Sequence, residues 1–129
     1  MVTTKVFTSD EHDSILLNDQ TAFRIGVQVD ATGVVANDEG RKILKAGTPL
    51  GGSASALEDN DDVVLTTSDS APQGILYRDV DVTAGQANAV MIVSGVVDVL
   101  KMDTTVQAMI TDDIKTALPK ITFFYGRKD

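Results

Sequence analysis

The side chains suited to catalysis or metal binding fall into a few acidic groups. The first is the run Asp10-Glu11-His12-Asp13, which contains the only histidine of the chain. Consecutive residues of an extended segment point in opposite directions, so this run is typical of a solvated charged segment and not of a metal site. A Ser-His-Asp triad would need the histidine held by a rigid shell. We therefore expect no catalysis by His12.

Two further groups of carboxylates could in principle do chemistry. The run Asp59-Asn60-Asp61-Asp62 has the first and third residues of an EF-hand loop, but Val63 and Ser70 stand at its fifth and twelfth positions, so the pattern fails. Asp79 and Asp81 share one face of an expected strand, as a glycosidase pair or a metal site could. Carboxylates on an exposed strand face are more often solvated, and an enzyme built on this pair is the weakest alternative. We expect no enzyme, no cofactor and no metal site.

Composition narrows the class of protein. The chain has 129 residues, no cysteine and a net charge of −8 at pH 7, which fits one domain that buries a core without disulfides. An acidic surface repels phosphate backbones and argues against a nucleic-acid partner. The longest apolar run, residues 89–100, is shorter than the roughly 20 residues that span a bilayer, so no membrane partner is expected. The N-terminal residues lack the pattern of a secretory signal, and we expect a cytoplasmic product.

Alternating apolar residues predict a mainly β structure. Residues 23–29 form the clearest strand, whose apolar face carries Phe23, Ile25, Val27 and Val29. Other short strands are predicted at residues 34–36, 63–67, 75–82 and 121–125. The most apolar segment, residues 89–100, predicts a central strand, in which Gly95 indicates a bulge or a close approach of another backbone.

Residues 103–118 change to a helical period. Their apolar residues recur at steps of three or four and include Val106, Ile110, Ile114 and Leu118. This pattern predicts one amphipathic helix that Asp103 or Thr104 caps and Pro119 ends. The expected fold class is α+β, mainly β: a small β-core with one C-terminal amphipathic helix. Residues 1–20 are expected to be an extended N-terminal arm before a body of residues 21–129. The arm is either a frayed terminus or a segment that adds a strand to a partner.

Two motifs carry a resemblance to a known family. Lys45-Ala46-Gly47-Thr48-Pro49-Leu50 reads as a rigid corner, because Gly47 permits positive φ and Pro49 favours an extended Thr48. Residues 74–83, Gly-Ile-Leu-Tyr-Arg-Asp-Val-Asp-Val-Thr, are followed by the apolar strand with Gly95 before Val97-Asp98. In this order the segments resemble the head decoration proteins of tailed bacteriophages, from about residue 41 to residue 103. The chain departs from their pattern at Gly51-Gly52-Ser53.

The resemblance implies both a fold and a function. It implies a β-tulip-like core in a non-enzymatic virion protein that assembles as a homotrimer. Such a trimer binds the outside of a phage capsid at three-fold or quasi-three-fold positions and stabilises the shell. Its partner is the major capsid protein, and its location is the capsid exterior, after assembly in the host cytoplasm. An alternative from another class is a phage carbohydrate-binding adhesion module with acidic loops, although the chain has no Trp and only two Tyr residues.

Specific residues follow from these expectations. The arm residues expected to bind the capsid are Lys5, Val6 and Phe7, together with Ile15, Leu16 and Leu17, where the arm joins the body. The subunit interface is expected at Gly47, Thr48, Pro49, Leu50, Gly74, Ile75 and Leu76. The apolar residues at positions 96, 97 and 99 crowd both faces of their strand, so the helix or another subunit must cover them. The aromatic residues at positions 123–125 fit either a core anchor or an interface.

Overall fold

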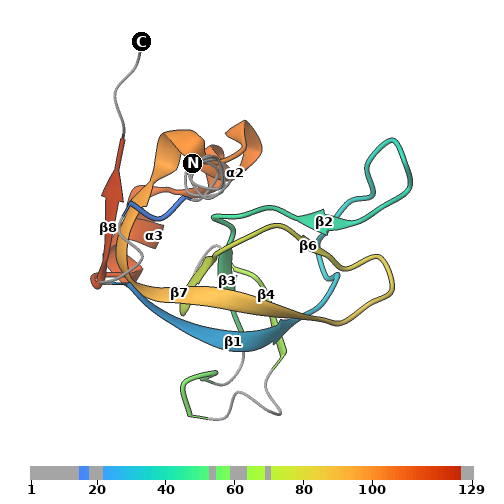
Figure 1. Ribbon diagram of the computed structural model, residues 1–129, viewed down its shortest axis with the longest axis horizontal. Coiled ribbons are helices and arrows are strands. Elements are labelled where there is room, and N and C mark those ends of the chain that lie inside the picture. Colours follow the sequence, from blue (N-terminus) through green and yellow to red (C-terminus); the bar gives the residue numbers. More distant parts are fainter. Residues whose placement is uncertain (1–14, 18–21, 53–54, 59–63, 69–70, 126–129) are drawn as a thin grey trace, which may run out of the picture.

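The computed structural model describes residues 15–17, 22–52, 55–58, 64–68 and 71–125. The protein is mainly β, with 39% strand and 15% helix, and it has a small sheet core and two short α-helices. The predicted class is therefore confirmed at this level. Figure 1 shows the helices and β8 (Ile121–Phe124) at one end of the molecule and the pair β2 (Ile43–Leu44) and β6 (Val80–Asp81) at the other.

The main sheet closes on itself. Its closed part consists of β1 (Phe23–Val29), β4 (Val64–Thr67), β3 (Pro49–Gly51), β5 (Gly74–Leu76) and β7 (Ala87–Asp98). Neighbours pair in that order, and β7 then pairs with β1, which completes the ring. The β1–β4 pairing is parallel, and the others in the ring are antiparallel. Closure pairs both edges of these short strands, so the ring presents no open edge of its own.

Strand β7 belongs to the ring and extends beyond it. Its first part pairs with β1 and β5, and the stretch from Gly95 to Asp98 pairs in parallel with β8. Gly95 has φ +139°, and a Cβ on it would lie 3.0 Å from the Ala22 Cβ. The close backbone approach predicted at Gly95 is confirmed, since only a residue without a side chain fits there.

Two hydrophobic clusters share β7. The cluster inside the ring contains Val27, Val29, Leu44, Leu50, Ala56, Leu65, Leu76, Val82, Ala89 and Met91. The cluster between the ring and the helices contains Ile15, Leu16, Ile75, Tyr77, Ile92, Val97, Val99, Met102, Val106, Ile110, Ile114, Leu118 and Ile121. Met91 belongs to the cluster inside the ring and Ile92 to the cluster beside the helices, so β7 is covered on both faces around these residues, whereas Val90 is 40% exposed. At the end of the strand, Val97 and Val99 are buried within the chain in the cluster that also contains residues 15 and 16, and Val96 is half-buried.

The prediction of one helix over residues 103–118 is wrong. The segment forms α2 (Thr104–Met109) and α3 (Asp112–Ala117), which are separated at Ile110 and Thr111. The Thr111 hydroxyl accepts a hydrogen bond of 3.3 Å from the Ile114 N–H, so it caps a new helix whose first turn carries Asp112 and Asp113. Asp103 caps α2 as predicted, since its carboxylate accepts from the Thr105 N–H at 3.0 Å.

Four details of the strand predictions are also wrong. The strand predicted at residues 75–82 is divided into β5 and β6, because β5 pairs with β3 and β7 whereas β6 pairs with β2. Residues 34–36 pair with no strand; they lie in a loop, and Val35 is 86% exposed. Phe23 leaves the apolar face of β1 and is 54% exposed, because the register shifts between Phe23 and Arg24. The central strand ends at Asp98, whose carboxylate accepts from the Leu100 N–H, and the 3₁₀ helix η1 (Val99–Lys101) follows.

Candidate functional site

The residues at the expected junction of arm and body are integral to the core. Ile15 and Leu16 are only 2% and 4% exposed, whereas Leu17 is 45% exposed. The Leu17 N–H donates to the Val96 carbonyl at 3.0 Å, and the Asp98 N–H donates to the Ile15 carbonyl at 2.8 Å. Residues 15–17 therefore pair with β7 as part of the folded body. Two of these side chains are not available to a partner, and Lys5, Val6 and Phe7 lie outside the described residues.

The residues expected at a subunit interface are core residues of the single chain. All seven are buried: Gly47, Thr48, Pro49, Leu50, Gly74, Ile75 and Leu76. They lie in the paired strands β3 and β5 and in the corner that precedes β3. At this corner the Gly47 N–H donates to the Leu76 carbonyl at 2.7 Å, and the Leu76 N–H donates to the Thr48 carbonyl at 2.9 Å. Leu50 and Leu76 lie in the cluster inside the ring and Ile75 lies in the cluster beside the helices, so these three side chains pack within the chain. A subunit interface at the seven residues stays a prediction.

The two motifs of the family resemblance meet as one structural unit. Besides the β3–β5 pairing, the Asp79 carboxylate accepts a hydrogen bond of 2.8 Å from the Ala46 N–H and lies 4.0 Å from the Lys45 ammonium. Gly47 has φ +95°, and a Cβ there would come 2.5 Å from the Met102 sulfur, so the corner needs glycine. The residues of these two motifs therefore fix the fold of this corner.

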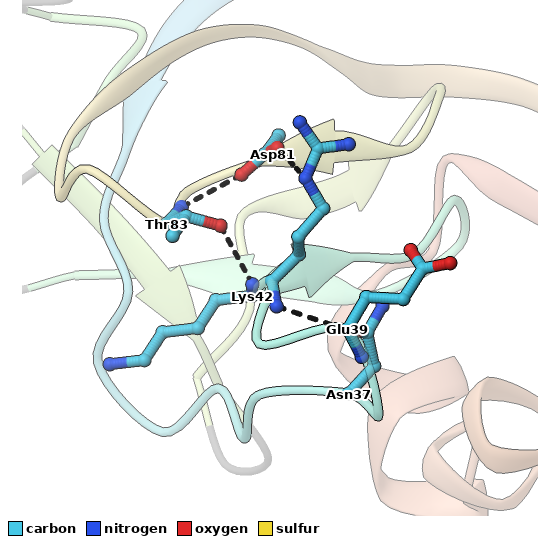
Figure 2. Close-up of polar contacts among 6 residues, drawn as sticks. Asn37, Glu39, Lys42, Asp81 and Thr83 are labelled. Atoms are coloured by element: carbon cyan, nitrogen blue, oxygen red, sulfur yellow. Dashed lines mark hydrogen bonds and ion pairs between the residues drawn. The ribbon is translucent and has the colours of Figure 1, made fainter.

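Asp81 also has a structural role, which Figure 2 shows. Its carboxylate accepts a 2.9 Å hydrogen bond from the Thr83 N–H, and the Thr83 hydroxyl accepts a 2.8 Å bond from the Lys42 N–H. Hydrogen bonds from the Thr83 hydroxyl and then from its backbone hold the pKa of Asp81 below its ordinary value of 3.8, and the charge of Arg41 adds a smaller effect in the same direction. An ion pair of 3.5 Å joins Arg41 to Asp81.

We call this arrangement the brace, because it links the loop of residues 37–42 to residues 80–83, which include β6. Asn37 closes the loop, since its side-chain oxygen accepts from the Glu39 N–H at 2.9 Å and from the Arg41 N–H at 3.1 Å. Asp79 and Asp81 hold different partners, Lys45 and the Ala46 N–H for Asp79 and Arg41 and the Thr83 N–H for Asp81. Both carboxylates are thus used in contacts within the fold.

A cavity of about 540 Å³ lies beside this brace. Its lining is mostly apolar, and the apolar residues are Val34, Val35, Ile43, Leu44, Val106 and Met109. Arg41, Lys45 and Asp103 lie among the lining residues, so the charges there are of both signs. Such a lining could take an apolar side chain or a small apolar molecule. The sequence gives no sign of this cavity, because its walls come from a loop, a two-residue strand and α2.

A second surface feature surrounds Tyr77, which follows β5. The guanidinium carbons of Arg24 and Arg78 lie 4.8 Å and 4.7 Å from the centroid of its ring. Tyr77 is 8% exposed, so its ring is not a platform for a sugar. In β8 and directly after it, Phe124 and Tyr125 are each 46% exposed, and the Lys115 ammonium lies 4.6 Å from the Tyr125 ring. Phe123 packs against the cluster beside the helices, so the aromatic run is divided between core and surface.

Within the part of the chain that the structure describes, no group of three or more His, Cys, Asp or Glu residues could hold a metal ion. His12 and residues 59–62 fall outside that part. None of the helices in the described segments has the length and apolar character needed to cross a bilayer. Comparison with protein-family models, curated proteins and solved structures gives no match.

Proposed function

We propose that this protein is a decoration protein of a tailed-phage head. In this proposal a homotrimer binds the outer surface of the capsid at three-fold or quasi-three-fold positions, contacts the major capsid protein and stabilises the shell. The fold is then of the β-tulip type, and the protein acts in the virion after assembly in the host cytoplasm. Binding of this kind needs a rigid body and several simultaneous contacts, because linked contacts multiply weak affinities, and it needs no catalytic group.

The observation that carries the proposal is the contact between the two resemblance motifs. They are separated in sequence, yet they pair through β3 and β5, and Asp79 joins them through the Ala46 N–H. Because the two motifs contact each other to form this corner, we expect proteins that contain the corner to carry both motifs. A shared fold is therefore the simplest reason for the shared order of motifs, and the capsid function follows by analogy with the family.

The buried anchor at residues 15–17 supports the expected arm. Ile15 and Leu16 fix the chain to β7, so any segment that precedes them starts from a rigid point of the body. Contacts made by Lys5, Val6 and Phe7 with a shell would then be transmitted to the core. We expect the arm to add a strand or apolar contacts to the capsid protein.

Shell binding by full-length variants tests this function. Wild-type protein should co-sediment with expanded, undecorated shells, and a Val6→Ser/Phe7→Ser variant should bind at least tenfold more weakly. The matched control is Val35→Ser, which removes an apolar side chain that is 86% exposed in a loop of the body. Equal binding by the arm variant and the control would refute the arm's role, and absence of wild-type binding would refute the function.

A further inference from the structure

The two guanidinium groups around Tyr77 form an unusual cationic surface on this acidic chain. Arg24 lies on β1 and Tyr77 directly after β5, and β7 runs between them, because β7 pairs with both strands. The Arg78 Nη2 donates to the Tyr77 hydroxyl at 3.3 Å, and the Tyr77 N–H donates to the Val90 carbonyl at 2.9 Å. The nearly buried ring thus fixes two cations on the outer face of the closed sheet.

Neither arginine has an acidic partner among the described residues. The ion pairs found there join Arg41 to Asp81 and Lys45 to Asp79. The chain carries 19 acidic and 11 basic residues, so two arginines that pair with no carboxylate of the described segments are unusual. Two like charges on one ring repel each other, and a carboxylate placed near both would be attracted by each of them.

Apolar groups lie next to these cations. Val90 is 40% exposed and pairs with Gly26, which bears no side chain and has open space around its Cβ position. Phe23, at the start of β1, is 54% exposed. Tyrosine and arginine next to exposed apolar groups are the residue types that dominate the binding energy of protein interfaces. Gly26 leaves room beside Val90 for a side chain of a partner.

We propose that the surface formed by Arg24, Gly26, Tyr77, Arg78 and Val90 binds an acidic segment of the capsid protein. A carboxylate of that segment contacts the two guanidinium groups, and a neighbouring aliphatic side chain covers Gly26 and Val90. This inference rests on the proposed function, because it places a shell contact on the body in addition to the arm.

The test is co-sedimentation with expanded, undecorated phage shells over a range of salt concentrations. The variant Arg24→Gln/Arg78→Gln should bind about tenfold or more weakly, and its affinity should depend less on salt than that of the wild type. The control Lys115→Gln/Lys120→Gln makes the same change in net charge at the helix end and should bind within about twofold of the wild type. Thermal unfolding checks that each variant is folded.

A second variant keeps the test independent of the arginines. Gly26→Gln places a side chain in open space on the same surface, so it should fold and weaken shell binding. Wild-type binding with both surface variants unaffected would overturn this inference and leave the proposed function standing. Absence of wild-type binding would overturn both. A third outcome is that the surface variants bind shells as the wild type does but differ from it in the mass of the free protein measured by light scattering. The surface would then join copies of this chain, and this result would also contradict the inference.

Discussion

Replacement of Leu16 by alanine tests most directly whether residues 15–17 belong to the hydrophobic core. The Leu16 side chain is 4% exposed and lies 3.6 Å from the Cβ position of Gly95, in the cluster between the ring and the helices. Truncation of a buried leucine costs about 2–5 kcal/mol, because apolar contacts are lost and a cavity remains. The adjacent Leu17 is 45% exposed, and its truncation should cost less than about 0.5 kcal/mol.

Urea unfolding followed by far-ultraviolet circular dichroism measures both variants, since the chain has no tryptophan to report by fluorescence. Leu16→Ala should lower the midpoint strongly with an unchanged slope, and Leu17→Ala should leave the midpoint near that of the wild type. The backbone hydrogen bonds of residues 15–17 to β7 remain in both variants, so the difference isolates the side chain. Equal midpoints for the two variants would refute the assignment of residues 15–17 to the core.

Further predictions concern glycine and acid. Gly95→Ala should lower the free energy of unfolding by about 1–3 kcal/mol, because the φ of +139° at Gly95 and the nearby Ala22 disfavour a side chain. Gly26→Ala is the control and should have little effect. Equal unfolding midpoints for the two variants would contradict this prediction. Hydrogen bonds from a threonine hold the pKa of Asp81 and of Asp103 below the ordinary value of 3.8. Each ionised carboxylate therefore stabilises the folded state above pH 3.8, and this stabilisation is lost as the pH falls through the lowered pKa of the folded state. Asp103→Asn keeps a capping oxygen, so its melting temperature should fall less between pH 5 and pH 2 than that of the wild type; an unchanged acid dependence would contradict the role of this carboxyl.

Local patterns in the sequence predicted the strands with a clear period. The bounds of β1, Phe23–Val29, agree with the alternation, and the cap at Asp103 and the close approach at Gly95 were readable from residue types. The break between α2 and α3 also had a signal, since Thr111 followed by Asp112 and Asp113 is a helix start. The break was not predicted, because the apolar residues keep a helical spacing across it: Val106, Ile110 and Ile114 all lie in the cluster beside the helices.

Other features depend on contacts that are distant in sequence. The parallel pairing of β1 with β4 closes the ring, and no local pattern specifies it. We predicted a subunit interface at residues 74–76, and the structure shows that these residues form the short strand β5, which is buried and pairs with β3 and β7. The cations on Tyr77 come from β1 and from the bend after β5, and only Arg78 is its neighbour in sequence. The shell contacts that we propose would likewise depend on the surface of a partner, which no local sequence pattern of this chain describes.

The most direct test of the account is the binding stoichiometry of the full chain on expanded phage shells. Purified protein is titrated onto undecorated shells, the shells are sedimented, and the bound amount is compared with the amount of capsid protein. Decoration predicts saturation at a fixed ratio set by the three-fold and quasi-three-fold positions, with shells that then withstand higher temperature. Binding that never saturates, or no binding to any expanded shell, would contradict the proposed function.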